Sequence, residues 1–250
     1  MYIAMEYCIM SLNDAIKLKA QVFDRHQSSD EQLMDCMEYY ITCELLLEIL
    51  ESVRYLHEDC KPPIIHRDLK PHNILIADDI RNGRFIKLCD LGLITVHEKL
   101  SQSHTIGVGT TKYMAPEVEK GRKYNTKADV YSISAIIEDL FDTDVNDNSN
   151  KYMETVWNDK YVRLLRIINE TMKPIYEERP TCAQIIAKYK EWAIDMTVVT
   201  NDKIMFNEKL HQIRQREREL RSVDRDSEPE FWEIFYTFVC IKTNCLNITF

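Results

Sequence analysis

The sequence lacks the patterns of three protein classes. Its eight cysteines include no C-x-x-C pair that would bind zinc or exchange thiols. Residues 1–6 show neither a basic stretch nor an apolar run long enough for a secretory signal. Its 32 Lys and Arg are outnumbered by 41 Asp and Glu, and a surface with a net charge of -9 on average repels phosphate backbones and anionic lipids. We therefore expect a cytosolic protein, with a nuclear location as the alternative, and no nucleic-acid or membrane partner.

What the sequence does contain is the composition of an ordinary globular protein. Hydrophobic residues make up 45% and charged residues 29% of the chain, and 250 residues are enough to bury one sizeable core. No internal repeat is visible, which excludes a solenoid. Apolar residues recur at spacings of three and four in four segments. This spacing predicts helices at 41–57, 126–141, 161–172 and 181–194.

Strand patterns are shorter. Residues 1–8 are apolar and contain Tyr2 and Ile3, which predicts a buried strand. Alternation in 85–88, after the apolar runs of 64–76, predicts two short hairpin strands that flank a loop. Between Ser11 and Glu38 the chain is polar and charged, and no element is predicted there.

The body is expected to end near residue 194, which leaves a tail at 195–250. Within 203–223, apolar residues fall at near-heptad spacing among many charges, and this favours a solvated helix over a weak dimeric coiled coil. A membrane span through the apolar run at 231–241 would have to bury Glu233 and Lys242. A charged residue near the centre of a bilayer costs ~2.5 to 3.5 kcal/mol, so packing on the body or a frayed tail is preferred to a membrane span.

The strongest chemical pattern is His-Arg-Asp-Leu-Lys-Pro-His-Asn at residues 66–73. Transfer of a phosphoryl group to an alcohol needs three groups, namely a carboxylate that orients the hydroxyl and accepts its proton, a cation on the phosphate, and oxygen ligands for magnesium. Asp68, Lys70 and Asn73 supply these groups within one loop.

A second carboxylate follows an apolar strand pattern. Asp90 comes directly after the run 86–89 and stands before Leu91 and Gly92. A carboxylate at the end of a strand can reach a metal that bridges nucleotide phosphates, because Mg2+ prefers a few hard oxygen ligands. Asp90 and Asn73 are therefore the candidate metal ligands.

The order of these motifs, followed by Ala-Pro-Glu at 115–117, resembles that of eukaryotic protein kinases over roughly residues 1–194. The resemblance implies an α+β protein-kinase-like fold, mainly the helical C-terminal lobe with the last small-lobe strand and the hinge. It also implies that Glu117 pairs with Arg179 and that Asp129 bonds the backbone of the catalytic loop.

The same resemblance implies an ATP site. Met5 is similar to the gatekeeper residue, Glu6 to Cys8 to the hinge whose backbone bonds adenine, and Leu75 to the residue beneath the base. ATP and Mg2+ are thus the implied cofactors, with Asp68 as the base and Lys70 as the cation on the transferred phosphate.

The resemblance also indicates the substrate type. Lys70, two residues after the base, and Thr110 are typical of kinases that act on Ser and Thr of proteins. Arg67 resembles the arginine that grips a phosphorylated activation loop, with Thr105 as the best-placed acceptor and Ser101 and Ser103 behind it. Short matches at 5–8, 90–95 and 105–114 are most similar to the kinases of the alpha subunit of translation initiation factor two, which suggests such a factor as substrate.

Two departures from the family pattern affect these expectations. Leu91 replaces the usual phenylalanine, but a leucine fills the same apolar slot. The glycine-rich loop and the phosphate-binding lysine of the family pattern are not found before the hinge. We therefore expect little activity from these 250 residues alone, and a truncated pseudokinase that acts as an interaction scaffold is the alternative. A small-molecule phosphotransferase is a remote third interpretation, disfavoured by Glu117 and Arg179.

Overall fold

The computed structural model describes residues 7–23, 25, 33–81, 84–90, 95–96, 111–144, 146, 152–201 and 203–223. The strands are β1 (Cys8–Ser11), β2 (Ile64–Ile65), β3 (Ile74–Arg81), β4 (Arg84–Leu88) and β5 (Thr95–Val96). The α-helices are α1 (Leu12–Val22), α2 (Cys36–Arg54), α3 (Pro116–Glu119), α4 (Lys127–Phe141), α5 (Asn158–Thr171), α6 (Cys182–Ala187), α7 (Tyr189–Trp192), α8 (Met196–Thr200) and α9 (Lys203–Val223). Short π- and 3-10 helices are η1 (Tyr55–Asp59), η2 (Pro71–Asn73), η4 (Thr111–Tyr113) and η5 (Tyr176–Glu178).

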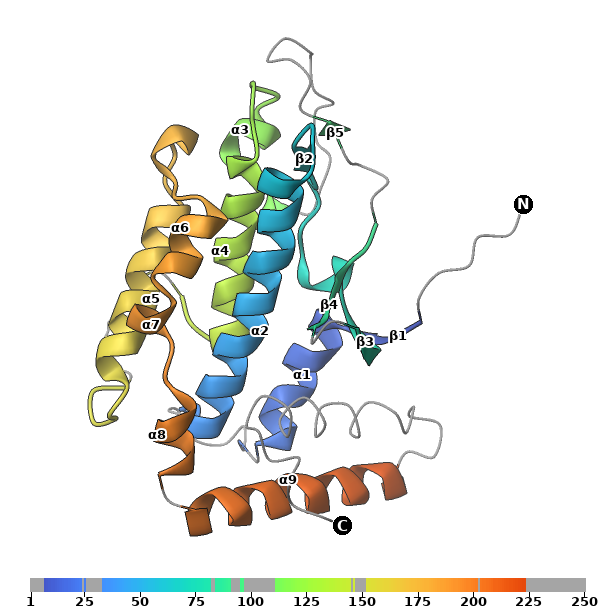
Figure 1. The fold of residues 1–250 in the computed structure, drawn as a ribbon, viewed down its shortest axis with the longest axis vertical. Helices are drawn as coiled ribbons and strands as arrows, with labels where there is room; N and C mark the ends of the chain where they lie inside the picture. The colour runs from blue at the N-terminus through green and yellow to red at the C-terminus, as the bar shows by residue number, and fades with distance from the viewer. Residues whose placement is uncertain are drawn as a thin grey trace.

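The helices form the body, and the small sheet lies at one side of it. Helices α2, α4 and α5 stand next to one another, α2 and α4 run in opposite directions, and α9 crosses the lower end beneath α1 (Figure 1). A mostly helical molecule with a small sheet confirms the predicted α+β class. The predicted helices at 41–57, 126–141 and 161–172 are confirmed as α2 with η1, α4 and α5.

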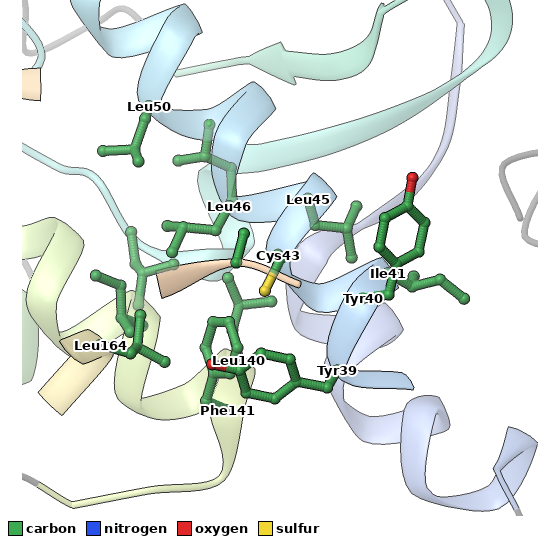
Figure 2. Packing of buried hydrophobic residues seen from close by; sticks show 14 of the residues in the cluster. Tyr39, Tyr40, Ile41, Cys43, Leu45, Leu46, Leu50, Leu140, Phe141 and Leu164 are labelled. Atoms are coloured by element: carbon green, nitrogen blue, oxygen red, sulfur yellow. The ribbon is translucent and has the colours of Figure 1, made fainter. Parts of the chain in front are cut away.

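The core is centred on α2, whose side chains are buried along most of its length. Figure 2 shows Tyr39 and Leu46 of α2 beside Leu140 and Phe141 from the end of α4. The rings of Tyr39 and Phe141 meet edge to face with centroids 5.3 Å apart. Full burial of one large apolar side chain stabilises by about 1.5 to 3 kcal/mol, so this contact fixes α4 against α2.

The sheet has the strand order β1-β3-β4. The predicted hairpin is confirmed, since β3 pairs antiparallel with β4 and Leu75 lies opposite Lys87. Strand β1 adds to the other side of β3, where Ser11 lies opposite Leu75. The two-residue β2 pairs instead with β5. The polar segment 66–73 therefore lies between two separate sheets.

Three predictions about helices need correction. The polar stretch after Ser11 forms α1, which begins with a capping box between Ser11 and Asp14. The single helix expected at 181–194 is broken at Lys188 into α6 and α7. The break lets the buried Trp192 donate its indole N–H to the carbonyl of Ile185 at 3.2 Å.

Helix α9 is not solvated on all sides, as the sequence pattern had suggested. Phe206, Leu210 and Ile213 are buried in the same core as α1. A dimer through 203–223 stays a prediction, and the apolar run at 231–241 lies outside the described residues. Among the described helices, none is both long and apolar enough to span a bilayer.

Candidate active site

The three residues predicted in the catalytic loop meet around one carboxylate. Oδ2 of Asp68 accepts a hydrogen bond from Nζ of Lys70 at 2.8 Å and another from Nδ2 of Asn73 at 2.9 Å. Nδ2 of Asn73 also donates to the backbone carbonyl of Asp68 at 2.8 Å. The side chain of Asp68 is 7% exposed and that of Lys70 is 22% exposed. The carboxylate is thus held in one orientation, while the lysine stays in contact with solvent.

The loop gets its shape from the short helix η2. Pro71 stands at its first position, where a missing N–H costs nothing. The amide of Asn73 donates to the carbonyl of Lys70 at 2.9 Å and closes the turn. This turn brings the side chain of Asn73 back to Asp68, which lies five residues earlier in the chain.

Asp90 lies close to this loop through its neighbour Cys89. The amide of Cys89 donates to the carbonyl of Asn73 at 3.0 Å, and Nε2 of His66 donates to the carbonyl of Cys89 at 2.9 Å. Asp90 itself is exposed and has φ 58, a left-handed conformation that is uncommon for a residue other than glycine. The backbone therefore turns at Asp90, next to Asn73.

Asp129, in the first turn of α4, fixes the start of the catalytic loop. Its carboxylate accepts from the backbone N–H of His66 and of Arg67, each at 2.9 Å. Nε2 of His57 donates to the same carboxylate at 2.8 Å. Asp129 is fully buried, and Arg67 has φ 70, so these bonds hold a strained turn in place. The role predicted for Asp129 is confirmed.

The predicted pair of Glu117 and Arg179 is also confirmed. Nη1 and Nη2 of Arg179 bind the two carboxylate oxygens of Glu117 at 2.6 and 2.8 Å. The guanidinium also donates to the carbonyl of Lys127 at 3.0 Å, and it lies over the ring of Tyr131. Arg179 is almost fully buried, and its charge is met by the carboxylate of Glu117 and by backbone carbonyls.

The residues predicted for nucleotide binding are only partly described. Cys8 lies in β1 opposite Ala77, and Leu75 is half-buried in the neighbouring β3. Burial, with the nearby charge of Asp90 and the thiol of Cys8, raises the pKa of Cys89. Met5 and Glu6 lie outside the described residues.

Five residues of the activation loop discussed above also lie outside them, namely Leu91, Ser101, Ser103, Thr105 and Thr110. Two residues of the described site were not foreseen. His57 was placed only at the end of a helix, and Tyr124, whose hydroxyl accepts from Nη1 of Arg67 at 3.0 Å, was not considered. Tyr124 contacts the catalytic loop directly and His57 acts on it through Asp129, and neither residue stands in a local pattern that would have identified it.

Comparison with known proteins decides the family. The model of the protein kinase domain matches residues 1–218. The chain belongs to the protein kinase domain family. The match continues beyond residue 194. The end of the kinase domain that the sequence suggests near residue 194 stays a prediction.

The similar kinases are of the serine/threonine type. A probable serine/threonine-protein kinase of Dictyostelium discoideum is 30% identical over 164 residues, which cover 62% of this chain and 17% of that protein. The interferon-induced, double-stranded RNA-activated protein kinase of Mus musculus is 28% identical over 203 residues, or 77% of this chain and 35% of that protein. Eukaryotic translation initiation factor 2-alpha kinase 3 of Rattus norvegicus is 28% identical over 209 residues, or 74% and 17%.

These relatives confirm the predicted likeness to serine/threonine kinases and, among them, to initiation factor 2-alpha kinases. The matched part of this chain spans 17% to 35% of the length of these three relatives. Members of the family generally use ATP and Mg2+.

Proposed function

We propose that the chain carries out, as part of a serine/threonine protein kinase, the transfer of the γ-phosphate of ATP to a Ser or Thr hydroxyl of a protein. The observation that carries this proposal is the fixed carboxylate of Asp68. One of its oxygens is occupied by Lys70 and Asn73, which leaves Oδ1 to accept the proton of a substrate hydroxyl.

Lys70 is the proposed cation on the transferred phosphate. Its side chain is partly exposed and is bound to Asp68 through a single pair. An exposed lysine has a flexible stem, so its ammonium can turn from the carboxylate to an incoming phosphate. The protein thereby places a positive charge where negative charge develops during transfer.

The donor set fits Mg2+ and ATP. Nδ2 of Asn73 is used for bonds to Asp68, so its Oδ1 stays available as a hard oxygen ligand. Asp90 is exposed one residue after Cys89, whose amide is bonded to Asn73. When bound, Mg-ATP supplies the phosphoryl group, with Asn73 and Asp90 as the proposed metal ligands. Met5, Glu6, Cys8 and Leu75 are the proposed contacts of adenine.

The proposed substrate is a protein, and an initiation factor is the first candidate to test because of the relatives described above. Glu117 and Arg179 support this view, since their buried pair fixes α3 beside the start of α4 and gives a substrate a firm platform. The cytosolic location and the dimer stay predictions.

Nucleotide binding is tested first, by thermal shift of the full chain. Mg-ATP is expected to raise the melting temperature of the wild type, while ATP with EDTA gives a smaller shift. Asp90→Asn should lose the part that depends on Mg2+. Asp159→Asn is the matched control, because Asp159 is an exposed aspartate at the start of α5. No shift with Mg-ATP would count against this proposal and favour the scaffold alternative.

Phosphoryl transfer is tested with labelled ATP and a purified initiation factor alpha subunit. The wild-type rate is expected to be low, because the glycine-rich loop and the phosphate-binding lysine are not found before the hinge. Asp68→Asn should lower this rate by about 100-fold or more, because it removes the base. Asp159→Asn should leave the rate unchanged. Phosphoamino-acid analysis should find phosphoserine or phosphothreonine, and label in tyrosine would contradict the assigned type.

A further inference from the structure

A cluster of unpaired positive charge lies directly after α3. Lys120, Arg122 and Lys123 are exposed, and within the described part of the chain their side chains take part in no ion pair. We call these three residues the basic rim. On a chain with net charge -9, three exposed cations within four residues form a local field opposite to that of the whole protein.

The backbone of the basic rim is firmly held. The amide of Arg122 donates to the carbonyl of Glu117 at 2.8 Å, and Glu117 is itself locked by Arg179. Gly121 has φ 61 and its amide donates to the carbonyl of Val118 at 3.0 Å, so the chain makes a tight left-handed turn that glycine permits. The three cations therefore stand on a fixed loop.

This loop borders the catalytic loop. Tyr124 follows Lys123 directly, is 4% exposed, and accepts a hydrogen bond from Nη1 of Arg67 at 3.0 Å. Arg67 directly precedes Asp68. Hence one hydrogen bond joins Tyr124, which follows the basic rim, to Arg67, which precedes the proposed base. Helix α3 lies beside β2, where the catalytic loop begins (Figure 1).

Other charged groups of this region are already occupied. Lys112 pairs with Asp139, and Lys127 donates to the carbonyl of Arg179. Glu119 is the exposed acid of the same segment, and it leaves the basic rim with an excess of two positive charges. Among the described residues, the rim is thus the set of cations beside the catalytic loop for which no ion pair is found.

We propose that the basic rim binds acidic residues of the protein substrate close to the phosphorylated Ser or Thr. This inference rests on the proposed function, because it assumes that the substrate lies over Asp68. The chemistry it names is a carboxylate or a phosphate group carried by a peptide, which a fixed pair of lysines and an arginine can contact together.

A peptide fits better than a polyanion. Nucleic acid and anionic membranes present long arrays of charge that would meet the acidic remainder of the surface. A short acidic segment meets only the rim. Exposed cations that merely keep a protein in solution need no fixed backbone and no link to the catalytic loop, whereas these have both.

Binding of short labelled peptides, followed by fluorescence anisotropy, tests the proposal. One peptide carries a central serine with glutamates on both sides, a second has glutamines in their place, and a third has phosphoserines. The full chain is expected to bind the glutamate peptide about tenfold more tightly than the glutamine peptide at low salt, since exposed ion pairs are individually weak but act together. If the phosphoserine peptide binds more tightly than the glutamate peptide, phosphate is the recognised group. If these two peptides bind equally, the recognised group is a carboxylate.

The triple variant Lys120→Ser, Arg122→Ser, Lys123→Ser should reduce the preference to within about twofold. The matched control is Arg163→Ser, Arg166→Ser, Lys190→Ser, which removes three exposed cations of α5 and α7 and should keep the preference. Equal loss in both variants, equal binding of the glutamate and glutamine peptides, or no binding up to millimolar concentration would overturn the proposal. So would an RNA oligonucleotide that competes through the rim while the peptides do not discriminate.

The peptide readout needs no phosphoryl transfer. A chain that prefers acidic peptides but shows no Mg-ATP shift would therefore refute the proposed function and leave the rim as a binding surface. A chain that shifts with Mg-ATP but does not discriminate the peptides would refute the rim alone.

Discussion

Helices α2 and α4 pack side by side in opposite directions, and a largely buried group of ionisable side chains lies at each end of the pair. At one end are His57, Glu117, Asp129 and Arg179, which we call the catalytic-end network. At the other end are Lys19, Arg25, Glu38 and Asp142, the far-end network. Asp129 and Asp142 lie at opposite ends of α4, about 20 Å apart along the helix.

The two networks satisfy their charges in different ways. At the catalytic end, Asp129 accepts two backbone N–H bonds and one from His57, and Arg179 binds Glu117 through two parallel bonds. At the far end, Glu38 lies 2.8 Å from Nη2 of Arg25 and 3.7 Å from Nζ of Lys19. Neither of its carboxylate oxygens makes a well-aligned hydrogen bond within the described residues.

The electrostatic consequence is visible at Glu38. Burial raises its pKa from 4.5 to about 7, although Lys19 and Arg25 act in the opposite direction. Burial likewise lowers the pKa of Lys19. The comparison teaches that burying opposite charges together is not enough, because a carboxylate also needs directed donors to stay ionised at low cost.

Breaking the bidentate pair should have the largest effect. Arg179→Ala leaves the carboxylate of Glu117 buried without its partner and is expected to lower the free energy of unfolding by about 3 to 5 kcal/mol. Urea denaturation measures this loss. Replacing both partners, as Arg179→Met with Glu117→Leu, should cost far less, because no unpaired charge remains. A single variant as stable as the wild type would contradict this account of the catalytic end.

Removal of Asp129 should come next. Asp129→Ala leaves the amides of His66 and Arg67 without their acceptor, which is expected to cost about 3 kcal/mol in urea denaturation, since each unsatisfied buried donor costs roughly 1 to 3 kcal/mol. Asp129→Asn keeps one acceptor oxygen and should lose less. If the alanine and asparagine variants were equally stable, the backbone bonds would not be what fixes the catalytic loop.

The far-end network should respond to pH instead. Because the folded-state pKa of Glu38 is raised to about 7, folded protein binds this proton more tightly than unfolded protein, and the stability from Glu38 is lost as pH rises from about 4.5 to 7. The expected loss is on the order of 2 to 3 kcal/mol relative to Glu38→Gln, in which the window should vanish.

This experiment is read as the difference between wild type and Glu38→Gln in urea denaturation at each pH, so that other titrating groups cancel. Lys19 acts with the opposite sign, because a lowered lysine pKa makes the stability rise with pH. The variant Lys19→Met, measured alongside, separates the contribution of Lys19 from that of Glu38. Arg25, Asp35 and Asp142 face Glu38 as well and stay unchanged. A flat difference would mean that the carboxylate of Glu38 is satisfied as well as that of Asp129.

The sequence predicts the fold where apolar residues recur at helical spacing over a long segment. Helices α2, α4 and α5 carry long apolar series, and all were predicted. Helix α1 was missed because charges interrupt its pattern, and one of them, Lys19, is itself buried through the far-end network. The pairing of β2 with β5 involves two residues from each strand, so only the tertiary structure determines it.

The same distinction between local and long-range contacts applies to the candidate site. Asp68, Lys70 and Asn73 lie within one loop, so their meeting follows from local spacing and a turn. His57 and Asp129 are 72 positions apart, and nothing in either neighbourhood marks the contact. Family resemblance supplied Asp129 as a loop anchor, but it did not supply its histidine partner.

The smallest effect is expected where α9 covers the far end. Nζ of Lys209 lies 2.7 Å from Asp35, the N-cap of α2, and over the ring of Phe23. Both charged side chains are partly exposed, at 24% and 39%, so solvent weakens the pair and Lys209→Gln should cost less than about 1 kcal/mol in urea denaturation.

Lys209→Met is the matched control, because it keeps the apolar stem on Phe23 and removes only the charge. The cost of either variant should shrink at high salt. If Lys209→Gln instead costs as much as Arg179→Ala and also moves the pH window of Glu38, then α9 keeps water from the far-end network. In that case the missing hydrogen bonds of Glu38 would reflect exclusion of water by α9, and the two ends of the α2–α4 pair would differ in access of water as well as in geometry.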